Sequence, residues 1–289
     1  MFKKLVDAID RQAWLDSLGD AIQQSIGKAF QSSGRIGKET QNLLNGTWLG
    51  HALHPALSDV PIGAWTTSIF LDMVENGDHS LAKASDRAIL LGLLASVPAS
   101  LSGLTDWQHL IDKPKRVGLM HGLLNLSSTA LYSLSLVLRS QGHRGAGKLL
   151  STVGYATVIA SSYLGGELVM EYHSGVNWVG TLEEPKDFKP VIEESKLEDN
   201  TPVCVTVDSV PLMLVRWQGN IYALANTCPH LGGPLCEGEF DSGIITCPWH
   251  GSKFDVTDGS IIDGPTAYPA KRFQTRISNG QVEVRLAEI

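Results

Sequence analysis

Residues 228–255 read CPHLGGPLCEGEFDSGIITCPWHGSKFD and contain two short loops that each supply one cysteine and one histidine. Cys228 and His230 lie in the first loop, and Cys247 and His250 lie in the second. Thiolate and imidazole ligands in this number suit either a tetrahedral zinc ion or an iron–sulfur cluster. A mixed pair from each loop favours a two-iron cluster, because one iron can take both thiolates and the other iron both imidazoles.

The sequence on both sides of these loops predicts a small all-β domain from residue 183 to residue 289. Short runs of β-type residues recur there, separated by turn signals that contain Gly, Asn, Asp or Ser. Such spacing is typical of an antiparallel sandwich or barrel. The runs are residues 203–207, 212–217, 221–224, 244–246, 273–277 and 282–286, and the turns are residues 218–220, 241–243, 257–259 and 278–280.

The two loops closely resemble those of the Rieske [2Fe-2S] family, and the resemblance extends over about residues 183–289. It implies that Cys228 and Cys247 bind the inner iron, and that His230 and His250 bind the outer, solvent-facing iron. It also implies a proline loop that covers the cluster, at residues 264–265. The residues expected around the cluster are Gly232, Trp249, Ser252, Phe254 and Pro265.

The loops also depart from the respiratory and photosynthetic quinol-oxidising members of that family. Those members carry two extra cysteines that join the loops by a disulfide, and Gly233 and Trp249 stand at these places here. Phe254 replaces a tyrosine whose hydroxyl donates to a ligand sulfur, although Ser252 is kept. Because loss of such a donor lowers the potential, we expect a ferredoxin-like cluster at the low end of the Rieske range of about −150 to +300 mV.

Cys204 and Cys236 are the two cysteines outside the ligand set. Cys204 alternates within a predicted strand, so we expect a small buried apolar residue. Cys236 follows the first loop, and the four ligand positions are already filled. We therefore expect no disulfide, which fits a reducing compartment.

The first half of the chain has a different character. Charged residues make up 18% of the whole chain, against about 25% in ordinary soluble domains, and residues 88–105, 117–138 and 149–166 contain none. A membrane-spanning helix needs about 20 mainly apolar residues. Residues 88–107, 117–138 and 149–170 meet this length, and residues 55–74 form a weaker fourth segment. We therefore predict an all-α four-helix transmembrane bundle; buried helices of a soluble protein are the alternative.

Histidines gather at one end of the predicted bundle. If the spans alternate in direction, His51, His54, His109, His121 and His173 all lie at the membrane face from which the C-terminal domain leaves. Polar groups at such depth are functional candidates, and facing helices can supply a pair of haem ligands. The candidate site for b-type haem or quinone consists of His51, His54, His121 and His173. Interfacial histidines that hydrogen-bond to helix ends are the alternative.

A second resemblance supports the membrane interpretation. The motifs GHALHP at residues 50–55, SDVPIG at 58–63, GLTDW at 103–107 and YLGG at 163–166, together with His121, are similar to an uncharacterised family of small bacterial four-helix membrane domains. The similarity covers roughly residues 50–178, and we place this domain at residues 47–178. The resemblance implies no activity.

Residues 1–46 are expected to form an amphipathic helix over residues 2–30 and a linker over residues 32–46 that is rich in Gly, Ser, Asn and Gln. The helix suits either a membrane surface or packing on the protein itself. It contains no apolar stretch typical of a secretory signal and no twin arginine. We therefore expect a multi-pass protein of the bacterial inner membrane, with both termini and the cluster domain in the cytoplasm.

These features favour a membrane-anchored one-electron transfer protein without a substrate-converting site of its own, so whether it is an enzyme stays open. Two alternatives are a membrane oxidoreductase whose bundle binds haem or quinone and exchanges electrons with the cluster, and a membrane redox sensor. The expected partners are membrane lipid and a redox protein, with a homo-oligomer left open. A net charge of −7 and the lack of a basic stripe exclude nucleic acid. An oxygenase is disfavoured because only 39 residues follow His250.

Overall fold

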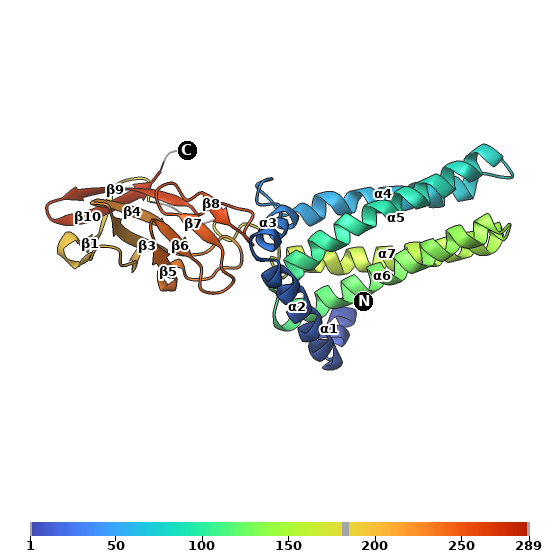
Figure 1. Cartoon of the computed structure of the whole chain (residues 1–289), viewed down its shortest axis with the longest axis horizontal. Helices are drawn as coiled ribbons and strands as arrows, with labels where there is room; N and C mark the ends of the chain where they lie inside the picture. Colours follow the sequence, from blue (N-terminus) through green and yellow to red (C-terminus); the bar gives the residue numbers. More distant parts are fainter. Residues whose placement is uncertain (1, 181–184, 288–289) are drawn as a thin grey trace. The chain divides into compact units, whose positions relative to one another are not determined.

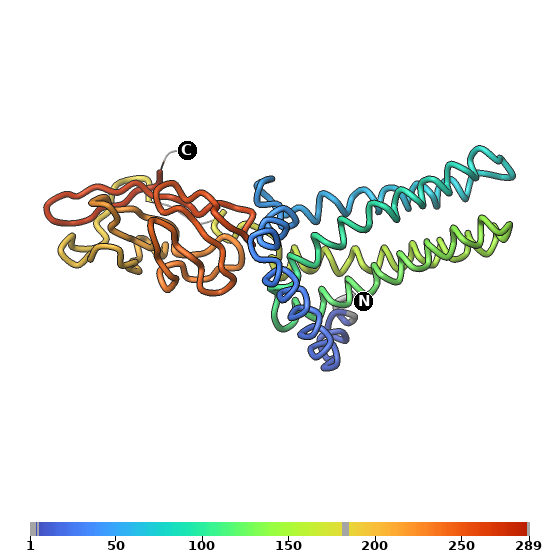
Figure 2. The backbone as a smooth tube through the Cα atoms, in the orientation of Figure 1, coloured from blue at the N-terminus to red at the C-terminus, as the bar shows by residue number. Residues whose placement is uncertain are grey.

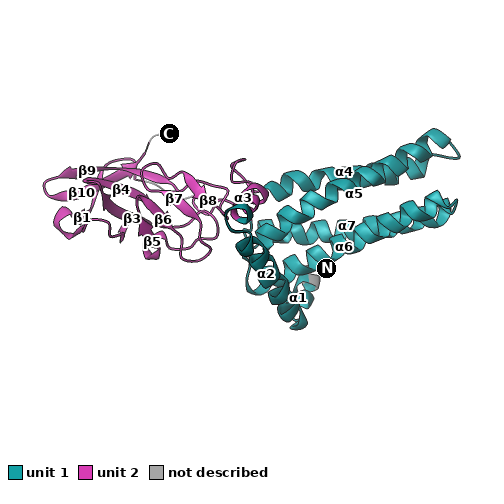
Figure 3. Ribbon diagram, viewed as in Figure 1, with its two compact units in different colours: residues 1–37, 53–174 teal, residues 38–52, 175–289 magenta. Residues whose placement is uncertain are grey.

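The computed structural model describes residues 2–180 and 185–287, and it forms two compact units (Figure 3). The first unit comprises residues 1–37 and 53–174, and the second comprises residues 38–52 and 175–289. The expected start of the β domain at residue 183 lies outside the described residues. The second unit therefore includes a short segment, residues 38–52, that precedes the long helices in the sequence.

Four long helices dominate the first unit, and all four predicted helical segments are confirmed as helices. They are α4 (Leu53–Val74), α5 (His79–Trp107), α6 (Asp112–Ser140) and α7 (Arg144–Met170). The trace in Figure 2 shows two helical hairpins, α4 with α5 and α6 with α7. Each helix starts before its apolar run, because polar residues can fill the first turn; the Asp78 side chain caps α5 by accepting the Ser80 N–H at 2.7 Å.

Among the described helices, only α5 is long and apolar enough to cross a membrane. The predicted transmembrane bundle is thus confirmed as helical but not as four spans. The difference arises because a count of charges ignores uncharged polar residues. In α6, Ser127, Ser128, Thr129 and Ser133 lower the hydropathy, and each hydroxyl donates to the carbonyl one turn earlier. Leucines along α5, such as Leu90, are exposed on the surface of this unit.

Large rings fit between the helices of the first unit because small residues face them. Trp65 of α4 and Tyr132 of α6 are buried and stacked, with ring centroids 4.4 Å apart. A Cβ atom at Gly92 of α5 would lie only 2.3 Å from the Trp65 indole nitrogen. Glycine at this position is therefore a packing requirement of the bundle.

At one end of this unit, α4 and α6 finish and α5 and α7 begin, and ionic side chains neutralise one another there. The Arg139 side chain is 1% exposed and pairs with Asp72 and Asp86. The other members are Arg144, which pairs with Glu75 at 2.6 Å and Asp86 at 2.9 Å, and Lys148, which pairs with Glu75 at 2.7 Å. A buried charge is tolerated only with such partners, so these cations do not form a free positive surface.

The N-terminal residues form two helices instead of one, α1 (Phe2–Asp10) and α2 (Trp14–Ser32). Both helices contact α6: Arg116 Nη2 lies 2.7 Å from Asp16 Oδ2, and Lys115 Nζ lies 2.7 Å from Asp20 Oδ1. The hydrogen bonds from Arg116 hold the pKa of Asp16 below its usual value. The interpretation that this region packs on its own protein is therefore confirmed for these acidic residues.

The predicted linker at residues 32–46 is wrong, because α3 (Gly34–Asn45) is a helix. Its Gly, Asn and Thr residues have low helix propensity. The Lys38 and Asn42 side chains of α3 hydrogen-bond to the C-terminal part of the second unit, and tertiary contacts of this kind override local propensity.

The C-terminal part of the second unit, residues 185–287, is confirmed as a β domain, with its strands in two antiparallel sheets (Figure 1). One sheet has the order β1-β10-β9-β4-β3-β2, and the other has the order β5-β6-β7-β8. Strands β1, β5, β7 and β8 were not predicted, and three of them contain only three residues. The strands are β1 (Lys189–Glu193), β2 (Val203–Val207), β3 (Val210–Trp217), β4 (Asn220–Ala225), β5 (Glu239–Asp241), β6 (Ile244–Thr246), β7 (Lys253–Asp255), β8 (Ile261–Asp263), β9 (Arg272–Ser278) and β10 (Gln281–Leu286).

The expectation that Cys204 and Cys236 stay unpaired is wrong. A disulfide joins Cys204 of β2 to Cys236 in the 3-10 turn η2 (Leu235–Glu237), with Cα atoms 5.5 Å apart. The two cysteines are 32 residues apart in sequence, and nothing local to either one indicates that the sheet brings them together. The disulfide ties the residues that directly follow the first cysteine–histidine loop to the edge strand of the larger sheet.

Candidate metal centre

The two cysteine–histidine loops connect strands of the second unit and close in the same way. In the first loop, the Cys228 N–H donates to the Gly233 carbonyl at 2.8 Å, and the Gly232 N–H donates to the Cys228 carbonyl at 2.9 Å. The corresponding hydrogen bonds in the second loop, residues 247–252, measure 2.8 and 3.1 Å. Each loop therefore presents its cysteine from the same kind of tight turn.

Glycine is needed at the same position of both turns, four residues after the cysteine. Gly232 has a φ of +84° and Gly251 has a φ of +74°. Residues with a Cβ atom rarely adopt this left-handed conformation. The turns differ in where the histidine stands, because His230 follows its cysteine by two residues and His250 follows its cysteine by three.

The two cysteine sulfurs lie together in the core of the unit. Cys228 and Cys247 are 1% and 3% exposed, and their side chains hydrogen-bond to each other. This hydrogen bond and the backbone N–H groups of Trp249 and His250 lower the pKa of Cys247 to about 6. The same pairing, together with burial, raises the pKa of Cys228, to which the backbone of His230 also donates. Backbone N–H donors aimed at sulfur stabilise the thiolate form that binds metal.

The two imidazoles form a second pair. The ring centroids of His230 and His250 lie 5.1 Å apart with their planes at 86°, and both residues are half-buried. Burial lowers the pKa of His250, which favours the neutral form that acts as a metal ligand. One edge of this pair is thus accessible from solvent while the sulfurs are not.

This arrangement fits a two-iron cluster better than a zinc ion. A structural zinc ion requires its four ligands to converge on one point. Thiols paired with each other and imidazoles paired with each other match the division of ligands between the two irons of a Rieske cluster. Such a cluster supplies one-electron chemistry when it is bound.

A chain of buried hydroxyls and amides surrounds the sulfurs. Ser252 is fully buried, its Oγ accepts the Thr266 N–H at 3.2 Å, and its side chain hydrogen-bonds to Cys228. Thr266 belongs to the proline loop, residues 263–268, which also contains Pro265. Phe254 is fully buried and has no hydroxyl to donate. Thr266 escaped sequence reasoning, because only its position next to Pro265 hints at a role.

Two tryptophans border the loops. Trp249 is 57% exposed, with its ring centroid 6.3 Å from that of His250. A Cβ atom at Gly233 would lie 2.8 Å from the Cys247 sulfur and 3.1 Å from the Trp249 ring, which explains why this position is glycine. Trp178 donates its backbone N–H to the Pro229 carbonyl at 3.2 Å. Trp178 was missed because it lies 50 residues before the first loop and belongs to no motif.

Of the histidines proposed for the helical region, the structure brings two together in the first unit. His54 of α4 and His121 of α6 have ring centroids 6.1 Å apart. His173 follows the end of α7 and has a φ of +53°. His51 belongs to the second unit, where its Nδ1 lies 2.9 Å from the Ala52 carbonyl oxygen.

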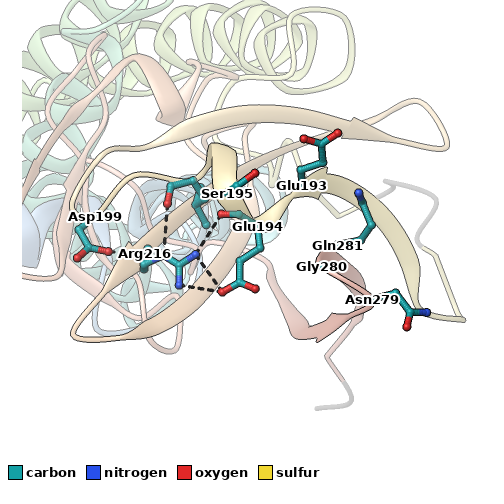
Figure 4. Close-up of a pocket in the computed structure, with 9 residues that line it drawn as sticks. Glu193, Glu194, Ser195, Asp199, Arg216, Asn279, Gly280 and Gln281 are labelled. Atoms are coloured by element: carbon teal, nitrogen blue, oxygen red, sulfur yellow. Dashed lines mark hydrogen bonds and ion pairs between the residues drawn. The ribbon is translucent and has the colours of Figure 1, made fainter.

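A separate hollow of about 720 Å³ lies beside β1 and the turn before β10, and it contains none of the proposed cluster ligands (Figure 4). Arg216 lines it and donates to the Glu194 carbonyl at 3.2 Å and to the Glu194 carboxylate at 3.4 Å. The Arg216 cation is therefore already paired within the hollow.

Comparison with known proteins agrees with the geometry of the loops. Residues 187–274 match the family model described as the Rieske [2Fe-2S] domain. The ferredoxin CarAc of Metapseudomonas resinovorans is 35% identical over 78 residues, which make up 27% of this chain and 73% of that protein. The chain belongs to the Rieske family. Residues 50–177 of this Rieske protein match a second model, described as a predicted membrane protein of the family DUF2231.

Two further relatives cover only part of this Rieske protein. Apoptosis-inducing factor 3 of Mus musculus is 35% identical over 77 residues, which cover 27% of this chain and only 13% of that protein. The solved structure of the ferredoxin of carbazole 1,9a-dioxygenase from Nocardioides aromaticivorans IC177 is 27% identical, covers 35% of this chain and 100% of that chain, and has a TM-score of 0.34.

The Ser252 hydroxyl provides a test of the sulfur environment. We expect Ser252→Ala to lower the midpoint potential of the bound cluster by about 40 mV, because a net hydrogen bond of about 1 kcal/mol to the more negative reduced state is lost. Protein-film voltammetry measures this shift. Ser242→Ala, on an exposed turn, is the matched control, and equal potentials for the two variants would contradict the assignment.

Proposed function

We propose that this Rieske protein is a membrane-attached one-electron carrier whose second unit holds a Rieske-type [2Fe-2S] cluster of low potential. The observation that carries the proposal is the separation of the ligands into a buried thiol pair and a half-exposed imidazole pair. Burial of the sulfurs protects them from solvent, whereas the imidazole edge and Trp249 remain accessible to a redox partner. Electron transfer needs only such an exposed edge and no substrate pocket.

The low potential rests on the donors to sulfur. Phe254 supplies no hydroxyl, so Ser252 and the backbone N–H groups of the loops are left to stabilise negative charge on the sulfurs. Fewer donors disfavour the reduced state. The similarity to ferredoxin CarAc supports the same conclusion, and we propose a partner of the reductase or acceptor type.

Membrane attachment rests on the first unit. Its match to the DUF2231 family and the apolar helix α5 support contact with lipid. Leu90, Leu91, Leu94, Val97 and Leu101 of α5 are all exposed in the described structure. An apolar surface of this extent on one helix is unusual for a soluble monomer. We therefore propose a multi-pass protein of the bacterial inner membrane.

Metal and sulfide analysis of the purified full chain tests the cluster. We expect two irons and two acid-labile sulfides per chain, with the EPR signal of a reduced Rieske centre. Cys247→Ser should abolish both, since a serine oxygen is a poor ligand for iron in this setting. Ser242→Ala, on an exposed turn outside both loops, serves as the control and should retain them. A colourless protein with a single zinc ion would refute the proposal.

The disulfide changes the expected orientation. Disulfides persist in oxidising compartments and are rare in the cytosol, so the pairing of Cys204 with Cys236 favours the second unit on the extracytoplasmic side. We expect an alkaline phosphatase fusion after Ile289 to be strongly active in a bacterial host. A fusion to green fluorescent protein at the same residue is the control and should be dark. The reverse pair of results would restore the cytoplasmic orientation.

A second candidate function gives the first unit a quinone or b-type haem. His54 donates its Nδ1 hydrogen to the Ala99 carbonyl at 2.8 Å, and His121 donates its Nδ1 hydrogen to the Ser161 carbonyl at 2.8 Å. This tautomer leaves a lone pair on each Nε2: that of His121 accepts from Asn125 Nδ2 at 3.0 Å, and that of His54 can accept from a hydroquinone hydroxyl or bind iron. Cβ atoms at Gly103 and Gly165 would lie 2.9 and 3.1 Å from these rings.

This candidate predicts that quinol reduces the cluster and that His54→Ala slows the reaction at least tenfold, while dithionite reduces wild type and variant equally. The loss corresponds to about 1.4 kcal/mol, as expected for one hydrogen bond to the reacting hydroxyl. His79→Ala, exposed at the start of α5, is the control. Stopped-flow absorbance measures the rate. Unchanged rates would reject a quinol site at His54, and a spectrum without haem bands would reject haem.

A further inference from the structure

The helix α3 reaches the proline loop within the second unit. Lys38 Nζ donates to the Gly264 carbonyl at 2.7 Å, and Asn42 Oδ1 accepts the Gly264 N–H at 2.9 Å. Asn42 Nδ2 also donates to Asp263 Oδ1 at 2.9 Å. Both backbone polar groups of Gly264 are therefore bound by side chains that lie more than 220 residues earlier in the sequence.

The contact is close as well as polar. A Cβ atom at Gly264 would lie 2.9 Å from Thr47 Cγ2 and 3.1 Å from Asn42 Oδ1, so no larger residue fits there without movement. Asn45 is 1% exposed, and its Nδ2 would lie 3.5 Å from the same Cβ. Residues 38–47, which we name the clamp segment, thus cover Gly264 on one side.

The proline loop links the clamp segment to the sulfurs. Two residues after Gly264, the buried Thr266 donates its N–H to Ser252 Oγ at 3.2 Å. The Ser252 side chain in turn hydrogen-bonds to Cys228. A displacement of Gly264 therefore moves the amide that orients Ser252, and Ser252 is a donor to a ligand sulfur. The Rieske match covers residues 187–274 only, so the clamp segment acts from outside the matched domain.

We infer that Lys38 and Asn42 are positioning residues that hold the proline loop closed over the cluster, so that the segment leading into α4 determines how firmly the cluster is retained and at what potential it works. This inference rests on the proposed function, because it requires the cluster. It extends that function by placing part of the control of the metal centre in the connection to the helical unit. In a chain cut to the matched domain, the proline loop loses these partners.

The experiment uses the purified full chain in detergent with the variants Asn42→Ala and Lys38→Met. Amide hydrogen exchange is followed on peptides that cover residues 261–270, and iron loss to a chelator is followed by absorbance. For each hydrogen bond removed we expect both rates to rise about threefold to tenfold. The midpoint potential should shift, and the unfolding temperature of the whole chain should not. Lys38→Arg keeps a donor and should restore the wild-type rates.

The matched controls remove an amide or a lysine side chain that makes no hydrogen bond to the proline loop. Gln41→Ala neighbours Asn42 on α3, and Lys28→Met removes an exposed lysine of α2; both should behave as wild type. Unchanged exchange and iron loss in Asn42→Ala and Lys38→Met would overturn the inference. A rise matched by an equal fall in overall stability would also overturn it, because the residues would then be merely structural. If wild type holds no cluster, the proposed function fails, while hydrogen exchange still reports whether the clamp segment holds the loop.

Discussion

The hydrogen bonds that fold residues 228–233 and 247–252 back on themselves are the constraint on which the metal centre depends. Each turn fixes a cysteine by its own N–H and carbonyl and leaves the next N–H groups aimed at sulfur. The first turn follows β4 of the larger sheet and the second joins β6 to β7 of the smaller sheet. The sulfurs meet inside the core of the unit, and the two imidazoles contact each other. This geometry requires glycine at positions 232 and 251, because both residues have a positive φ that glycine adopts without steric strain.

The rest of the second unit supports these turns from three directions. The disulfide between Cys204 and Cys236 fastens the chain directly after the first turn to the larger sheet. Trp178 contributes a backbone hydrogen bond to Pro229, and the proline loop orders Ser252 through Thr266. These contacts come from distant parts of the sequence, so the geometry of the metal centre depends on the fold of the whole unit. This distribution is typical of metal sites, where outer groups orient the ligands.

In the first unit, long helices pack together while apolar side chains remain exposed on their outer surface. Small residues and polar contacts contribute to this packing together with the hydrophobic effect. Gly92 admits Trp65, and Arg139 is matched by buried carboxylates. The same devices orient His54 and His121 through backbone carbonyls. These hydrogen bonds give both imidazoles a defined orientation.

The sequence by itself determined the helical and all-β halves, the positions of the long helices, the main strands and the two cysteine–histidine loops, because periodicity and motif spacing are local properties. It misjudged α3 as a linker and left Cys204 and Cys236 unpaired, and it did not reveal Thr266, Trp178, Lys38 or Asn42. Their partners lie from 14 to 226 residues away. Only the tertiary structure could decide such contacts, since they depend on which strands and helices become neighbours and not on the residues beside them.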